Sequence, residues 1–297
     1  MITDNWILYT LIATLLWSIT AIIDKFILTK ITQNEYIPLF FSSVIGVITA
    51  IIIFFILATE SISYYGYHLP LAAGLLYGIA GLFYFKAVKK KEISRVIALW
   101  NTAPIITAIL AIIFIGEVVT INKYLAVLAL VLGVYILESK DYWFSFTAGA
   151  KLILFSTVLV SIHYILIKLA FNQIDNFFIV FALVRIGYFI ATLPLFLINK
   201  QQISKFIYKL DRKTFIILVS SESLTTLGNL SITIAASTGY ITLVNGLSSL
   251  QPLVVLILAA ITTKIFRLNI KERLSVADFK RKFVAIIIIM TGLLLIA

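Results

Sequence analysis

The chain has 297 residues, of which 62% are hydrophobic and only 12% are charged, and its formal net charge is +11. A soluble domain of this size needs many more charged residues on its surface, so the composition excludes a soluble protein and predicts a polytopic membrane protein. The absence of cysteine excludes disulfide bonds and cysteine-based metal sites.

Ten apolar segments fill most of the chain. A helix needs roughly 20 such residues to cross a hydrocarbon core, and these runs are too long and too uniform for barrel strands. We therefore expect an all-α integral membrane fold with ten transmembrane helices. The expected segments are about Trp6–Ile27, Tyr36–Ala58, Leu69–Val88, Ser94–Ile115, Asn122–Leu137, Ala148–Phe171, Phe177–Ile198, Thr214–Ser237, Gly239–Thr263 and Phe283–Ala297.

The basic residues fall almost entirely in alternate gaps between these segments. Of the 24 Lys and Arg residues, 21 lie in or at the edges of the gaps after the first, third, fifth, seventh and ninth segments. Lys123 and Lys168 lie at the edges of other gaps, and Arg185 lies well within a segment. Short basic loops stay in the cytoplasm, so we expect a multi-pass protein of the cytoplasmic membrane with both termini outside. Charges scattered through short loops fit anionic lipid and argue against a nucleic-acid partner.

The two halves of the sequence resemble each other. Residues 14–25 can be laid over residues 157–168, with Thr, Leu, Ser, Ile, Ile and Lys recurring in register. An alanine that stands 17 residues before a proline also recurs, as Ala87 with Pro104 and as Ala235 with Pro252. The chain therefore reads as two five-helix repeats, residues 1–143 and 144–297.

An odd number of helices in each repeat predicts that the second repeat enters the membrane upside down. The charges agree, because the gap after the third segment is basic and its counterpart after the eighth is not, whereas the reverse holds for the second and seventh. Two inverted five-helix repeats around a central cavity are the architecture of secondary transporters, whose site lies at the repeat interface.

Short motifs give the chain a family resemblance along nearly its whole length. They are Leu16-Trp17-Ser18, Ala87, Pro104, Gly116-Glu117, Leu132-Gly133-Val134-Tyr135, Gly239-Tyr240-Ile241-Thr242, Leu250-Gln251-Pro252 and Thr291-Gly292. In these the chain resembles the EamA branch of the drug/metabolite transporter superfamily, which implies a transporter and not an enzyme. It departs from the family at Ile265, where members often carry a second Glu, and in its charge bias, since many members keep both termini cytoplasmic.

Polar residues inside the segments are the first candidates for a site, because a charge at the bilayer centre is costly. Glu222 begins a stripe with Thr225, Thr226 and Asn229 at helical spacing, and Arg185 and His163 lie near the centres of their segments. Glu222 is expected to bind an amine or a proton, His163 to carry a proton, and Arg185 to hold a carboxylate or phosphate. The alternative is that Glu222 and Arg185 pair and only fix helix packing.

Further polar and aromatic residues are expected around the same cavity. They are Trp100, Asn101 and Asn245, together with the aromatic side chains of Trp17, Tyr77, Tyr84 and Tyr164. Asp24 and Lys25 end the first segment and are expected to reach the membrane interface. Glu117 is expected to have a structural role near a helix N-terminus.

These patterns predict a secondary transporter that moves a small organic, amino-acid-like metabolite by alternating access, as proton-coupled export or exchange. The expected partners are a small-molecule solute, protons and the lipid bilayer, in a monomer or homodimer. No nucleotide-binding loop, protease motif or Cys/His cluster indicates a cofactor or metal. Two alternatives stay open: a membrane enzyme acting on a lipid or lipid-linked phosphate, and a non-transporting sensor or assembly subunit.

Overall fold

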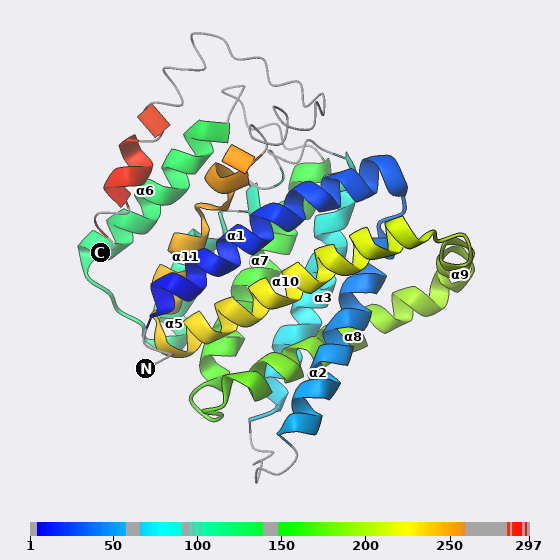
Figure 1. Cartoon of the computed structure of the whole chain (residues 1–297). Helices are drawn as coiled ribbons and strands as arrows, with labels where there is room; N and C mark the ends of the chain where they lie inside the picture. The colour runs from blue at the N-terminus through cyan, green and yellow to red at the C-terminus, as the bar shows by residue number, and fades with distance from the viewer. Residues whose placement is uncertain are drawn as a thin grey trace.

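The computed structural model describes residues 5–57, 66–90, 96, 99–100, 102–138, 148–255, 257–258, 284–285, 287–292 and 295. Every element in this part of the chain is a helix, so the predicted all-α class is confirmed (Figure 1). The helices are α1 (Trp6–Phe26), η1 (Ile27–Ile31), α2 (Tyr36–Ile56), α3 (His68–Lys90), α5 (Ala103–Ile115), α6 (Ile121–Glu138), α7 (Ala148–Ala170), α8 (Phe177–Ile198), α9 (Lys200–Tyr208), α10 (Arg212–Thr238) and α11 (Ile241–Ser248).

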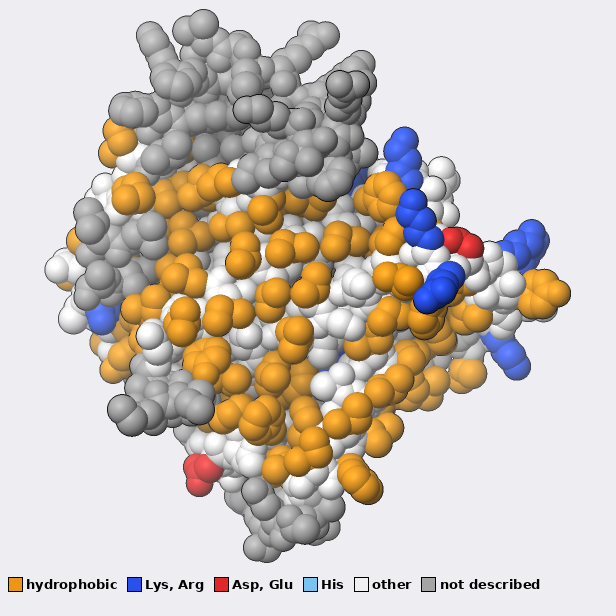
Figure 2. All heavy atoms as spheres, viewed as in Figure 1, with side chains coloured by type: hydrophobic (Ala, Val, Ile, Leu, Met, Phe, Trp, Pro, Cys, Tyr) orange, Lys and Arg blue, Asp and Glu red, His pale blue; other side chains and the backbone are white. Residues whose placement is uncertain are grey.

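Six helices of the described chain are long and apolar enough to cross a membrane. They are α1 with η1, α2, α3, α7, α8 and α10, and three shorter apolar helical stretches cover 103–115, 121–133 and 241–255, the last with a break after Ser248. The helices are apolar on their outer faces too, where Phe55 is 83% exposed and Ile198 80% exposed. Figure 2 shows such a face, covered by hydrophobic side chains, with Lys and Arg gathered at the edge near α9. The chain is therefore a multi-pass membrane protein.

Two local features differ from the expected segments. The ninth segment is broken, because α11 ends at Ser248 and helix resumes only at residue 251, next to Pro252, which has no N–H to donate. The short helix α9 is an addition. It was missed because it contains too few apolar residues to cross a membrane; it buries Ile203 and leaves its lysines exposed.

The helices pack across the two halves of the chain. α1 lies along α10 (Figure 1), and α3 lies between α7 and α8. α2 packs against α8, α5 against α7, and α1 against α11. When the helices of each half are matched in order and the added helix α9 is left out, α1 corresponds to α7, α3 to α10 and α5 to α11. The contact of α1 with α10 is then equivalent to that of α7 with α3, and the contact of α1 with α11 is equivalent to that of α7 with α5.

A serine hydrogen bond recurs at matched positions in the two halves. Ser18 Oγ donates to the carbonyl of Gln251 at 3.3 Å, and Ser161 Oγ donates to the carbonyl of Ala103 at 3.2 Å. Each serine also donates to the carbonyl four residues earlier in its own helix, at 2.6 and 2.9 Å. Ser18 matches Ser161 in the sequence, and each acceptor immediately precedes one of the two matching prolines.

A lysine contact recurs in the same way. Lys25 Nζ donates to the carbonyl of Val88 at 3.3 Å, and Lys168 Nζ donates to the carbonyl of Ala236 at 3.0 Å. The two lysines match in the sequence, and each acceptor follows one of the two matching alanines. Each acceptor also lies in the last turn of its helix, α3 or α10, where carbonyls lack helical partners and a cation is favourable.

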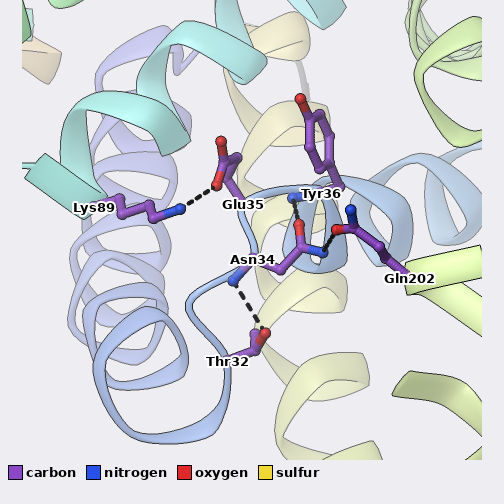
Figure 3. A network of polar contacts seen from close by, with 6 residues as sticks. All are labelled: Thr32, Asn34, Glu35, Tyr36, Lys89 and Gln202. Carbon is purple, nitrogen blue, oxygen red and sulfur yellow. Dashed lines mark hydrogen bonds and ion pairs between the residues drawn. The ribbon is translucent and has the colours of Figure 1, made fainter. Parts of the chain in front are cut away.

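A polar network joins three elements at one end of the bundle (Figure 3). Asn34 lies in the turn between η1 and α2, and its Nδ2 donates to Gln202 Oε1 of α9 at 2.9 Å. Lys89, near the end of α3, forms an ion pair with Glu35 at 2.9 Å. Burial raises the pKa of Glu35, but the hydrogen bond and charge of Lys89 outweigh it, so the pKa lies below its usual value. The pair therefore stabilises the fold at neutral pH, and this contribution is lost as the pH falls through the lowered pKa.

Helices α3 and α8 approach closely at glycines. A Cβ added to Gly74 would overlap the Val184 carbonyl and would lie 2.8 Å from Gly187 Cα. Small residues allow such contact between membrane helices, so side chains at these two positions would force α3 and α8 apart.

We predict that Gly74→Val lowers the melting temperature of the purified protein by several degrees, because α3 and α8 must separate. Leu75→Val is the matched control, since residue 75 lies on the same helix, is 37% exposed and receives the same β-branched side chain. Thermal unfolding of both variants in one detergent measures the difference. Equal melting temperatures would show that the close contact contributes little.

Candidate functional site

The larger of two neighbouring cavities lies between the halves of the chain and has a volume of about 90 Å³. Its walls come from α1, α2, α3, α7, α8 and α10, with contributions from Trp100 and Gln251. Two carboxylates, Asp24 and Glu222, lie in its lining, and no Lys or Arg does so among the described residues. The cavity is therefore acidic and is bounded by both halves.

Glu222 lies within α10 and is 1% exposed. Its Oε1 has no hydrogen-bond partner among the described residues. An unpartnered carboxylate oxygen in a buried site is costly, so its position in the cavity lining calls for a proton, a bound solute or water. Of the predicted polar stripe, Thr225 also lines this cavity, whereas Asn229 lines the smaller one.

Asp24 is a second carboxylate of the cavity, and the prediction that it reaches the interface is wrong. It is only 6% exposed, because α1 and η1 continue to Ile31, and it accepts a hydrogen bond from Ser221 Oγ at 3.3 Å. The sequence did contain a signal. Trp17, Thr20 and Asp24 are three and four residues apart, which places them on one face of a helix, and all three line the cavity.

Aromatic rings make up much of the remaining wall. Trp17, Tyr77, Tyr84, Trp100 and Tyr164, all expected around a cavity, line it. Phe85 and Tyr188, which were not predicted, line it as well. The rings of Tyr84 and Trp100 meet edge to face at 5.2 Å between centroids, and Trp17 fits against α10 where Gly228 leaves room for its indole nitrogen. Carboxylates among aromatic faces suit an organic cation or amine.

The smaller cavity, of about 10 Å³, contains the other predicted polar residues Arg185, His163 and Asn229. Tyr77 and Tyr164 line both cavities. His163 Nδ1 lies 2.9 Å from the carbonyl of Ala73, and the imidazole stacks on the Tyr77 ring at 4.7 Å. Tyr77 in turn donates to Asn229 Oδ1 at 3.2 Å. The predicted site is thus divided between two adjoining spaces.

Arg185 is 1% exposed and is held by neutral groups. Its Nη2 donates to the carbonyl of Ser42 at 2.8 Å and to Thr226 Oγ1 at 3.4 Å, and its Cζ lies 5.0 Å from the centroid of the Tyr188 ring. Gly46 leaves the space that the guanidinium fills, since a Cβ there would overlap it. No described carboxylate pairs with Arg185 within 4.0 Å, so the structure does not contain the direct Glu222–Arg185 pair of the packing hypothesis.

Two predicted residues do not lie in either described lining. Asn245 is 2% exposed and donates through Nδ2 to the carbonyl of Ile241 within α11 at 3.1 Å. Asn101 lies outside the described residues. The described residues also contain no group of three or more His, Cys, Asp or Glu side chains that could hold a metal ion.

Glu117 and Lys168 hold the connection between α10 and α11 from two sides. The Glu117 carboxylate accepts the N–H groups of Ile241 at 3.0 Å and Thr242 at 2.9 Å, and it is 6% exposed. Lys168 Nζ donates to the carbonyl of Gly239 at 2.8 Å in addition to that of Ala236. Glu117 therefore binds at a helix N-terminus, as expected, but at that of α11 in the other half of the chain.

Comparisons with known proteins concern the family and the fold of the chain. Residues 4–139 match the model of the EamA-like transporter family. The resemblance to EamA-type transporters is thereby confirmed over the first half of a multi-pass membrane protein. No curated protein sequence matches the chain.

The fold also occurs among solved structures. One, described only as the crystal structure of a protein, has a TM-score of 0.69 and 16% sequence identity. The alignment covers 98% of this chain and 96% of that one. At this identity the likeness shows a shared fold and does not indicate a substrate.

We predict that Glu117→Gln lowers the melting temperature more than Glu35→Gln does. The amide would keep one acceptor and place its N–H₂ group against one of the two buried backbone donors, at a cost on the order of 1–3 kcal/mol. A partly exposed pair such as Lys89–Glu35 contributes at most about 1 kcal/mol. Thermal unfolding of the two variants provides the comparison. A larger loss for Glu35→Gln would contradict the proposed importance of the α11 contact.

Proposed function

We propose that the chain is a secondary transporter that moves a small organic metabolite across the cytoplasmic membrane by alternating access. The observation that carries this proposal is the buried cavity lined by acidic and aromatic side chains from both halves. A transporter must expose such a site to each side in turn, and a site between two halves allows this when the halves move against each other. The EamA-like match over residues 4–139 supports transport over the enzyme and sensor alternatives.

Two inverted five-helix repeats, residues 1–143 and 144–297, are part of the proposal. The recurring serine and lysine contacts support it, because chance similarity between apolar segments would not place equivalent hydrogen bonds at aligned positions. Five helices per repeat would invert the second repeat. The basic bias of alternate gaps supports this inversion and the proposal that both termini lie outside.

An amine-bearing, amino-acid-like solute fits the chemistry of the cavity. Glu222 and Asp24 supply negative charge, and the surrounding aromatic rings supply faces on which a cation or a flat apolar group can rest. The volume of about 90 Å³ favours a small solute. Arg185 lies in the adjoining space, so we assign recognition of the positive group to Glu222 and do not place Arg185 in the same contact.

Glu222 is the proposed coupling residue, in either proton-coupled export or exchange. A buried carboxylate with an unpartnered oxygen can be stabilised by a proton or by a cationic solute, and competition between these two ligands couples their movements. His163 is the second proton candidate, but its Nδ1 is already engaged with the Ala73 carbonyl.

The first test is a thermal-shift screen of the purified protein at pH 6 and pH 8 against amino acids, amines, sugars, nucleotides and amphipathic cations. A compound that binds only the folded state raises the melting temperature by mass action. We expect hits among amines and amino-acid-like compounds, with larger shifts at pH 8 because protons then compete less for Glu222. Absence of any pH-dependent hit in these classes would contradict the proposal.

We predict that Glu222→Gln abolishes the pH dependence of transport in proteoliposomes. Solute-for-solute exchange would continue at a reduced rate, since the amide keeps the shape of the carboxyl group and loses its charge. Glu35→Gln is the control, because it makes the same chemical change at an ion pair outside the cavity. Full proton-driven flux in Glu222→Gln would exclude Glu222 as the coupling residue.

A further inference from the structure

The smaller cavity contains hydrogen-bond donors that have no partner. Arg185 Nε and Nη1 and Asn229 Nδ2 are buried and unpartnered among the described residues. Both side chains line this cavity, and they are 1% and 8% exposed. An unpartnered buried donor is costly, and an unneutralised buried cation is more so, which makes these groups a site for a ligand that accepts hydrogen bonds.

The neighbouring contacts fix the direction of these donors. Arg185 Nη2 is held by Ser42 and Thr226, so the planar guanidinium cannot turn its free edge toward those partners. The Tyr77 hydroxyl donates to Asn229 Oδ1, which leaves the amide nitrogen for another acceptor. Both side chains are therefore preorganised as donors before any ligand binds.

The charge and size of the cavity restrict its occupant. No Asp or Glu is among the described residues that line it, and the two nearby carboxylates, Glu222 and Asp24, line the larger cavity instead. The volume of about 10 Å³ corresponds to one water-sized particle. An organic carboxylate would have to displace the rings of Tyr77 or Tyr164 to enter.

We propose that this cavity binds a single small inorganic anion of the size and charge of chloride. A water molecule could accept the same hydrogen bonds, but it would leave the guanidinium with no anion in contact, and with carboxylates only in the adjoining cavity. The anion neutralises Arg185 and stabilises the packing of α8 against α2 and α10. This site is separate from the solute site of the proposed function and does not depend on it.

The experiment is a thermal-unfolding titration of the full-length protein in detergent, in which sodium chloride replaces sodium gluconate at constant ionic strength. Above the Kd, we expect the melting temperature to rise with the logarithm of the chloride concentration, on the order of 2–4 °C for each tenfold increase. Equal melting temperatures in chloride and gluconate, or an equal rise with sulfate, would overturn the proposal.

Three variants define the site. Asn229→Asp places a carboxylate in the cavity as a built-in anion, so we expect it to fold stably and to lose the response to chloride. Arg185→Gln should lose the response as well, whereas Lys205→Gln, which removes one charge from the exposed face of α9, should keep it. A wild-type response in Asn229→Asp would overturn the proposal even if Arg185→Gln failed to fold.

Crystals of the wild-type protein grown in bromide give a second, independent readout. We expect an anomalous peak in contact with Arg185 Nε and Nη1. Water alone at that position would overturn the proposal, and transport activity plays no part in this measurement.

Discussion

A bilayer offers no water to the polar groups of the helices within it, so each of these groups must find a partner inside the protein. Much of this chain follows that constraint. Thr14, Ser18, Thr157 and Ser161 donate to carbonyls one turn earlier in their own helices. Lys168 donates to backbone carbonyls at the end of α10, and Glu117 accepts backbone N–H groups at the start of α11. These contacts let polar residues lie inside helices whose described outer faces carry many exposed apolar side chains.

The same constraint makes the exceptions informative. Glu222, Arg185 and Asn229 keep buried polar atoms without partners among the described residues, and all three line one of two adjoining cavities. The hydroxyls of Thr107 and Thr242 also lack a hydrogen-bond partner there, but they line neither cavity. The larger cavity is acidic and aromatic, and the smaller one is lined by a cation and an amide. Tyr77 and Tyr164 border both spaces, so the two carboxylates and the guanidinium line different cavities.

The contact between the halves also depends on polar groups. Ser18 of α1 and Ser161 of α7 each form a hydrogen bond with a carbonyl in the opposite half of the chain. Glu117, just after α5, forms hydrogen bonds with the start of α11. Apolar side chains gain little from packing against each other in lipid, because lipid tails are equally apolar. Directional bonds and close glycine contacts such as Gly74 with Gly187 therefore decide which helices lie side by side.

Sequence reasoning found most of the helices because their apolar length is a direct response to membrane thickness. It missed α9, since a short amphipathic helix carries no such signal, and it misjudged Asp24, which was read from its place at the end of a segment and not from its helical face. It also grouped Glu222, Arg185 and His163 around one cavity. Position along a segment predicts their depth in the membrane, but the direction of each side chain depends on how its helix rotates against neighbours.

The sequence by itself determined the helical class, the membrane environment, the similarity of the two halves and the short list of buried polar residues, because composition and periodicity respond directly to lipid. Only the tertiary structure decided that Asp24 joins Glu222, that Arg185 turns to Ser42 and Thr226 instead of Glu222, and that Glu117 reaches α11. Those outcomes depend on contacts between residues far apart in the chain, and such contacts are set by helix rotation and close packing, which local patterns do not encode.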